Sequence, residues 1–170
     1  GRIFPLALAM MFFCNLCALA ITTPLPPLTD ELNPQRQEIG EGTRNLVLCI
    51  HGWNNPPVNN RYTDTTEWAW LVSKIKPVMQ ANTSDPWALV LYDWHQDADT
   101  GWIDFHGDSA GVALPQATQA SINARDHGIT LGPRLPTSLR RVHIITHSAG
   151  AWCAREVAAD LLARNPYVVI

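Results

Sequence analysis

The sequence predicts an α/β domain in which a parallel sheet carries helices on both faces. Short apolar runs recur along the chain, and longer segments with helical spacing lie between them. Apolar runs of this length are typical of strands buried on both faces, and their alternation with helices favours parallel pairing. The composition agrees with this class, because 46% of the 170 residues are hydrophobic and only 16% are charged.

The first three elements follow directly from local patterns. The run NLVLCI at residues 45–50 predicts the first buried strand. Residues 64–80 have helical periodicity, and Asp64 with Glu67 three residues later resembles a capping box. The run WALVLY at residues 87–92 predicts the second strand. The apolar face of the helix is expected to comprise Trp68, Leu71, Val72, Ile75 and Met79.

The remaining elements continue the same alternation. Residues 115–131 are rich in alanine and predict a helix that stops at Gly132-Pro133. RVHIIT at residues 141–146 predicts the third strand, and residues 149–164 predict the helix after it. A fourth strand is expected to begin at residues 167–170. The buried face of the last helix is expected to contain Ala151, Ala154, Ala158 and Leu161.

The N-terminal segment has the pattern of a secretory signal peptide. Residues 3–21 carry no charge, Arg2 precedes them, and Ala18-Leu19-Ala20 forms a cleavage-type site. We therefore expect residues 1–20 to be a signal peptide and the protein to be secreted or periplasmic. The alternative is a membrane anchor formed by residues 3–21. Residues 21–43 are rich in proline, glycine and charge, which predicts an irregular lead-in or linker before a domain at residues 44–170.

Ser148 is the candidate catalytic nucleophile. It stands in the pentapeptide Thr-His-Ser-Ala-Gly, between the third strand and the last helix. A sharp strand-to-helix turn would expose its hydroxyl, and Gly150 supplies the small residue that such a turn requires. The N–H of Ala149, at the start of the helix, is a candidate oxyanion donor. The alternative is a serine that only caps the helix.

A second loop complements the first. Ile50-His51-Gly52-Trp53 follows the first strand, and the carboxyl ends of parallel strands meet at one edge of a sheet, where ligands bind. We expect the N–H of Trp53 to be the other oxyanion donor. His51 and Gly52 are expected to shape this loop.

Taken together, these motifs resemble those of the α/β-hydrolases, and within them the secreted lipases of the pancreatic type. The matching residues are IHGW at 50–53, Asp93-Trp94, and VHIITHSAGA at 142–151. The resemblance covers residues 44–170 and implies the α/β-hydrolase fold and a serine ester hydrolase that needs no cofactor and no metal. Thr146 stands where the family has glycine, which is a departure from its pattern.

The base and acid of a catalytic triad are not evident. The family order is serine, acid, histidine, but no histidine follows Ser148, and the acids after it, Glu156 and Asp160, lie on the outgoing helix. We therefore expect the acid and the histidine beyond Ile170. On this interpretation the chain is the N-terminal part of the domain, ending shortly after the elbow helix, and is inactive alone.

The expected partner is an ester or lipid substrate, with transient contact with lipid surfaces. The formal net charge of −3 provides no basic footprint for nucleic acid. Two alternatives stay open: a peptidase or amidase on the same fold, and a non-catalytic binding protein. The Asp- and His-rich residues 93–108 are expected to form a solvated rim, rather than a calcium loop through Asp97 and Asp99. The sequence predicts neither the acyl specificity nor the oligomeric state.

Overall fold

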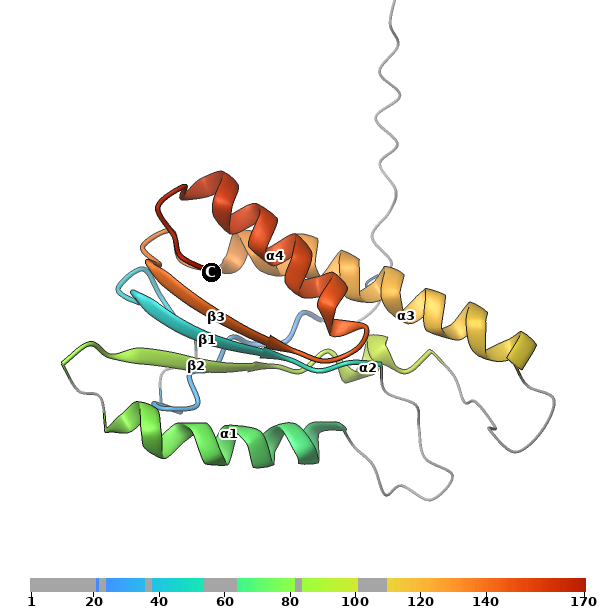
Figure 1. The fold of residues 1–170 in the computed structure, drawn as a ribbon, viewed down its shortest axis with the longest axis horizontal. Coiled ribbons are helices and arrows are strands. Elements are labelled where there is room, and N and C mark those ends of the chain that lie inside the picture. Colours follow the sequence, from blue (N-terminus) through green and yellow to red (C-terminus); the bar gives the residue numbers. More distant parts are fainter. Residues whose placement is uncertain (1–20, 22–23, 36–37, 54–63, 82–83, 101–109) are drawn as a thin grey trace, which may run out of the picture.

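The computed structural model describes residues 21, 24–35, 38–53, 64–81, 84–100 and 110–170, without the side chains of residues 64–67 and 110–115. It has three layers, with a sheet between helices (Figure 1). Helix α1 (Asp64–Gln80) covers one face, while α3 (Ala110–Leu131) and α4 (Gly150–Arg164) cover the other. The predicted signal peptide and the side chains of the predicted capping box lie outside the described residues.

The sheet is parallel, as the sequence predicts. Strands β1 (Asn45–Ile50), β2 (Trp87–Tyr92) and β3 (Arg141–Thr146) have the predicted bounds. Their order is β2-β1-β3, so β1 is central, and all six of its residues are buried. Ile50 is paired in register with Tyr92 and with Thr146. The three strands therefore end at one edge, and the loops that follow them start side by side.

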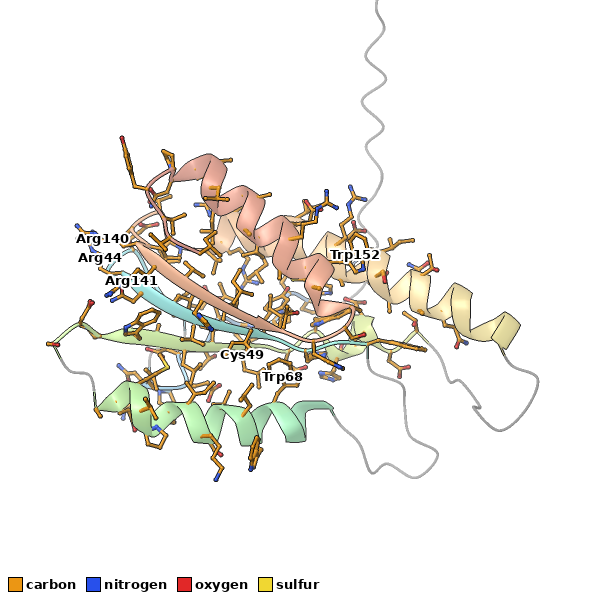
Figure 2. The ribbon with its side chains drawn as sticks, in the orientation of Figure 1. Arg44, Cys49, Trp68, Arg140, Arg141 and Trp152 are labelled. Atoms are coloured by element: carbon orange, nitrogen blue, oxygen red, sulfur yellow. The ribbon has the colours of Figure 1, made fainter. Side chains whose placement is uncertain are left out.

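Alternate residues of β1 supply two separate clusters. Leu46, Leu48 and Ile50 join the larger one, beneath α3 and α4. Val47 and Cys49 join the smaller one, in which Cys49 lies between the sheet and Trp68 of α1 (Figure 2). The predicted apolar face of α1 is confirmed, because every member of it belongs to or packs against this cluster.

Cys49 and Cys153, the cysteines among the described residues, are free and buried. Burial raises the pKa of Cys49 to about 11, and burial likewise holds the pKa of the Cys153 thiol above its usual value. Because a thiolate is the reactive form, both thiols are inert at neutral pH.

Glycines allow α3 and α4 to pack closely. A Cβ atom at Gly128 would lie 2.5 Å from the carbonyl oxygen of Cys153 and 2.9 Å from its Cα. One turn later, a Cβ at Gly132 would lie 2.7 Å from the Cβ of Asp160. At the C-terminal end of α4, the guanidinium of Arg164 donates to the carbonyls of Gly132 and Leu135, which follow α3.

Two helices differ from their predicted limits or faces. Helix α3 begins at Ala110, five residues before the predicted start, although Pro115 then stands at its sixth position, where proline removes one intrahelical hydrogen bond. The buried face of α4 is offset from the prediction: Ala151 is exposed, and Ala154 and Ala158 are only half-buried. Its buried residues are Gly150, Cys153, Val157 and Leu161.

The predicted fourth strand is present only as a single parallel bridge between Arg141 and Val169. Val142 donates to the carbonyl of Val169, and Val169 donates to the carbonyl of Arg140. Residues 167–170 supply no further ladder bonds among the described residues, and Tyr167 is 89% exposed. The prediction of a strand at residues 167–170 is therefore wrong for this structure beyond that bridge.

The lead-in is irregular and packs onto the domain. Its described residues form no helix or strand, yet Leu28 and Ile39 lie in the larger cluster. Asp30 accepts hydrogen bonds from the amides of Leu32 and Leu89, and Glu31 donates to the carbonyl of Leu89. The lead-in thus covers the outer edge of β2 and satisfies backbone groups there.

Replacing Gly128 with Ala is expected to lower the free energy of unfolding by about 1–3 kcal/mol, because the added methyl meets backbone atoms of α4 that cannot move independently. Urea denaturation measures this. Gly42→Ala is the matched control, since nothing lies within 4 Å of its Cβ position, and it should change stability by less than about 1 kcal/mol. Equal effects of the two changes would contradict the close packing of α3 on α4.

Candidate active site

Ser148 occupies a strained turn between β3 and α4. Its φ is 49°, the only positive value at a non-glycine residue in the described part of the chain. The left-handed conformation costs an L-residue about 1–2 kcal/mol, and such strain clusters at functional sites. Only three residues separate Thr146 from Gly150, and the side chain of Ser148 is exposed. The predicted elbow is therefore present.

Gly150 is required where α4 meets the end of β1. A Cβ atom there would collide with the carbonyl oxygen of His51 and would lie 2.8 Å from that of Ile50. It would also lie 2.7 Å from the Oγ1 of Thr146. Glycine is thus the residue that lets the first turn of α4 rest on the central strand.

The loop after β1 contacts Ser148 through Gly52. A Cβ at Gly52 would lie 2.8 Å from the carbonyl oxygen of His147 and 3.0 Å from the Cβ of Ser148. The two loops that the sequence singles out are therefore in direct contact. Gly52 also begins the peptide bond to Trp53, so the residue that contacts Ser148 is the one that precedes the Trp53 amide.

The candidate oxyanion donors are the amides of Trp53 and Ala149. Within the described residues, neither forms a backbone hydrogen bond, whereas the next three amides of α4, from Gly150 to Trp152, have acceptors in the turn. Ala149 stands at the N-cap of α4, where free N–H groups and the helix dipole favour negative charge. That both amides converge on one point near the Oγ of Ser148 stays a prediction.

His51 shapes the loop after β1 and is fully buried. Its Nδ1 lies 2.9 Å from the carbonyl oxygen of Gly52, and its Nε2 lies 3.0 Å from the amide of Trp94. A carbonyl only accepts and an amide N–H only donates, so Nδ1 carries the proton and Nε2 is bare. His51 is therefore neutral and already engaged, which leaves it no free nitrogen to act as a base.

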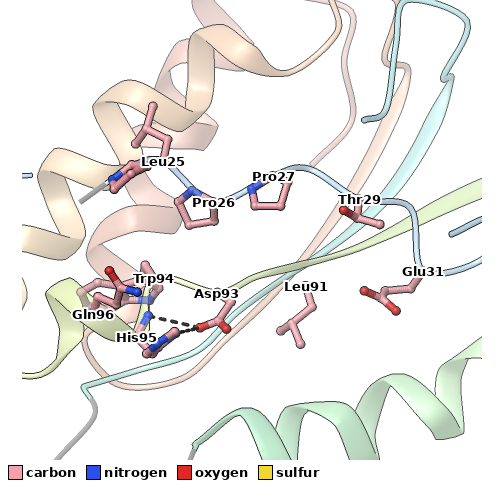
Figure 3. A pocket seen from close by; sticks show the side chains of 11 residues that line it. Leu25, Pro26, Pro27, Thr29, Glu31, Leu91, Asp93, Trp94, His95 and Gln96 are labelled. Carbon is pink, nitrogen blue, oxygen red and sulfur yellow. Dashed lines mark hydrogen bonds and ion pairs between the residues drawn. The ribbon is translucent and has the colours of Figure 1, made fainter. Parts of the chain in front are cut away.

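Asp93 and His95 form an exposed pair after β2. Asp93 Oδ1 lies 2.8 Å from His95 Nδ1 and 3.3 Å from His51 Nε2. Burial opposes ionisation of Asp93, but hydrogen bonds from the ring and the backbone N–H of His95 outweigh it and lower the pKa of this carboxyl to about 2. The pair lines a cavity of about 500 Å³ between the proline-rich lead-in and the end of β2 (Figure 3).

A buried network next to this pair was not predicted. His127 Nε2 lies 2.9 Å from Asp97 Oδ2, and its Nδ1 lies 2.8 Å from the hydroxyl of Tyr92. Burial lowers the pKa of His127, against the effect of Asp97. Asp97 is only 4% exposed, so the prediction that it lies in a solvated rim is wrong. The physical reason is its place in helix α2 (His95–Ala98), which packs against α3.

No described histidine or acid pairs with Ser148. His143 and His147 are exposed, and no hydrogen bond joins any described histidine to Ser148. Glu156 lies 3.8 Å from Arg125, and Asp160 accepts from Arg164, so both acids of α4 have other partners. His106 lies outside the described residues. The described residues thus include the strained turn at Ser148 and the adjacent loop, but no histidine among them is bonded to the serine.

Comparisons with protein-family models, with curated proteins and with solved structures gave no match. The site therefore has to be interpreted from its own geometry. Among the described helices, none combines the length and the apolar character needed to cross a bilayer.

Ser148→Gly is expected to be more stable than Ser148→Ala by about 1 kcal/mol, because glycine adopts a positive φ without a Cβ clash. Urea unfolding of the two variants measures the difference. Ser73, in the exposed part of α1, is the matched control, and there glycine should instead be less stable than alanine by about 1 kcal/mol. The same sign at both positions would argue against strain at Ser148.

Ionised Asp93 is expected to stabilise the fold above about pH 4. Its folded pKa of about 2 lies below the ordinary 3.8, so this contribution declines as the pH falls through that interval. The stability difference between the wild type and Asp93→Asn, from urea midpoints, should shrink from pH 5 to about pH 2. A difference that does not change with pH would contradict the ionised pair.

Proposed function

We propose that the protein is a secreted serine hydrolase of the α/β-hydrolase fold, lipase- or esterase-like, with Ser148 as its nucleophile. The observation that carries the proposal is the positive φ of Ser148 in a short strand-to-helix turn, packed against the glycine of a second loop. A serine that merely caps a helix needs neither feature. Strain of this kind is what a nucleophile elbow requires.

In the proposed reaction, a base takes the proton of the Ser148 hydroxyl while its Oγ attacks the carbonyl carbon of an ester. The negative charge that develops on the carbonyl oxygen is stabilised by the amides of Trp53 and Ala149 and by the start of α4. The tetrahedral intermediate expels the alcohol, which receives the proton from the base. Water then gives a proton to the base and attacks the carbonyl carbon of the acyl-enzyme. The carboxylic acid leaves as the base returns the proton to the Oγ of Ser148.

The base and its acid are proposed to come from residues outside the described set. His51 is excluded by its two hydrogen bonds, and His127 by its burial between Tyr92 and Asp97. In the pancreatic-type lipases that the motifs resemble, the acid and the histidine follow the serine in sequence. A peptidase or amidase would use the same groups, so an ester and an amide with one common acyl group distinguish these activities.

Contact with lipid surfaces is also proposed. Trp152 and Leu162 on α4 are both about half exposed, at 46% and 50%. Trp152, labelled on α4 in Figure 2, is four residues after Ser148 in the first turn of that helix, so we propose that an apolar substrate aggregate bound there would be near the nucleophile. Secretion is proposed on the apolar leader of residues 1–20.

Replacing Ser148 with Ala in the whole protein is expected to reduce hydrolysis of a p-nitrophenyl ester by several orders of magnitude, because loss of a triad member leaves only about 10³–10⁴-fold catalysis over water. Ser73→Ala is the control and should retain wild-type turnover. Labelling by a fluorophosphonate should be lost with Ser148 and kept with Ser73. Unchanged turnover in Ser148→Ala would refute the proposal, and a wild type that neither turns over nor labels would favour the non-catalytic alternative.

A further inference from the structure

Trp94 holds His51 in place through two hydrogen bonds to different parts of the residue. Its backbone N–H donates to His51 Nε2 at 3.0 Å, and its indole Nε1–H donates to the His51 carbonyl oxygen at 2.9 Å. The two rings are also stacked, with centroids 5.4 Å apart. Trp94 is 2% exposed, so these bonds are shielded from water and their geometry is tightly held.

His51 passes this constraint to the peptide that carries the oxyanion donor. Its Nδ1–H donates to the carbonyl oxygen of Gly52 at 2.9 Å. That carbonyl and the N–H of Trp53 belong to one planar trans peptide, so they point in opposite directions. Fixing the carbonyl on the His51 side therefore aims the Trp53 N–H to the other side of the loop.

We propose that Trp94 is the positioning residue for the oxyanion donor of Trp53. The amide of Trp94, 3.0 Å from Nε2, is closer to it than Asp93 Oδ1 is, at 3.3 Å, and so keeps the proton of His51 on Nδ1, where it binds Gly52. The indole of Trp94 anchors the backbone of His51 from the opposite side. The inference rests on the proposed function, because the donor has a role only if Ser148 forms an oxyanion.

Neighbouring groups restrict the orientation of the Trp94 indole. Its ring lies against His127, with centroids 5.5 Å apart, and His127 is bonded on both nitrogens. Asn123 of α3 donates to the carbonyl of Asp97, which ties the short helix after Trp94 to α3. The loop after β1 is thus braced by a helix on the other side of the core.

Trp94→Phe removes the Nε1–H donor and keeps an aromatic ring over His51. In the whole protein we expect kcat for a p-nitrophenyl ester to fall about 10- to 100-fold with KM within about twofold, because a misplaced oxyanion donor weakens transition-state binding and leaves ground-state binding intact. Trp87→Phe is the matched control: it is the same change at the start of β2, the end of that strand away from Ser148, and it should leave kcat unchanged.

A wild-type kcat in Trp94→Phe, with Ser148→Ala inactive, would overturn the inference and leave the proposed function standing. Activity in Ser148→Ala would instead refute the proposed function. Should Trp94→Phe fail to fold, ¹⁵N NMR of the His51 ring in the wild type decides the matter. A protonated Nδ1 with a bare Nε2 across neutral pH supports the inference, and a protonated Nε2 overturns it.

Discussion

The contact between the first turn of α4 and the end of β1 is the constraint on which the rest of the site depends. The carbonyl oxygens of Ile50 and His51 lie where a side chain at Gly150 would have to be, so the helix can start only with glycine at that position. With α4 held so close, the chain must turn within three residues, and Ser148 takes the positive φ. Exposure of its hydroxyl follows from backbone geometry rather than from any bond of its own.

The second loop is held by a different kind of interaction. Its histidine is buried and neutral, with both ring nitrogens used, and an unsatisfied group there would cost about 1–3 kcal/mol. From His51 the bonded and stacked contacts continue through Trp94 to His127 and into α3. A buried polar network of this type fixes one arrangement of the backbone, which is what preorganised donors require.

Local patterns predicted much of this structure, because strands and amphipathic helices are encoded in neighbouring residues. The bounds of all three strands and the turn at Ser148 came from such patterns. The offset of the buried face of α4 to Cys153 and Val157 was missed, since alanine spacing alone does not reveal which face meets Gly128. The bonds of His51 to Trp94 and of His127 to Asp97 span 43 and 30 residues, and no spacing rule encodes contacts of that separation.

The geometry also separates two contributions to the proposed chemistry. Donors at a helix start and in a braced loop act on charge as it forms, and together with substrate binding such groups retain about 10³–10⁴-fold catalysis when a triad member is removed. In the proposed chemistry, the described residues would supply this electrostatic part, and none of them is placed as a proton acceptor for Ser148. A base must therefore approach the hydroxyl from a direction that neither Gly52 nor α4 occupies. Such a base would accept the proton of the Ser148 hydroxyl, whose backbone position the turn already fixes.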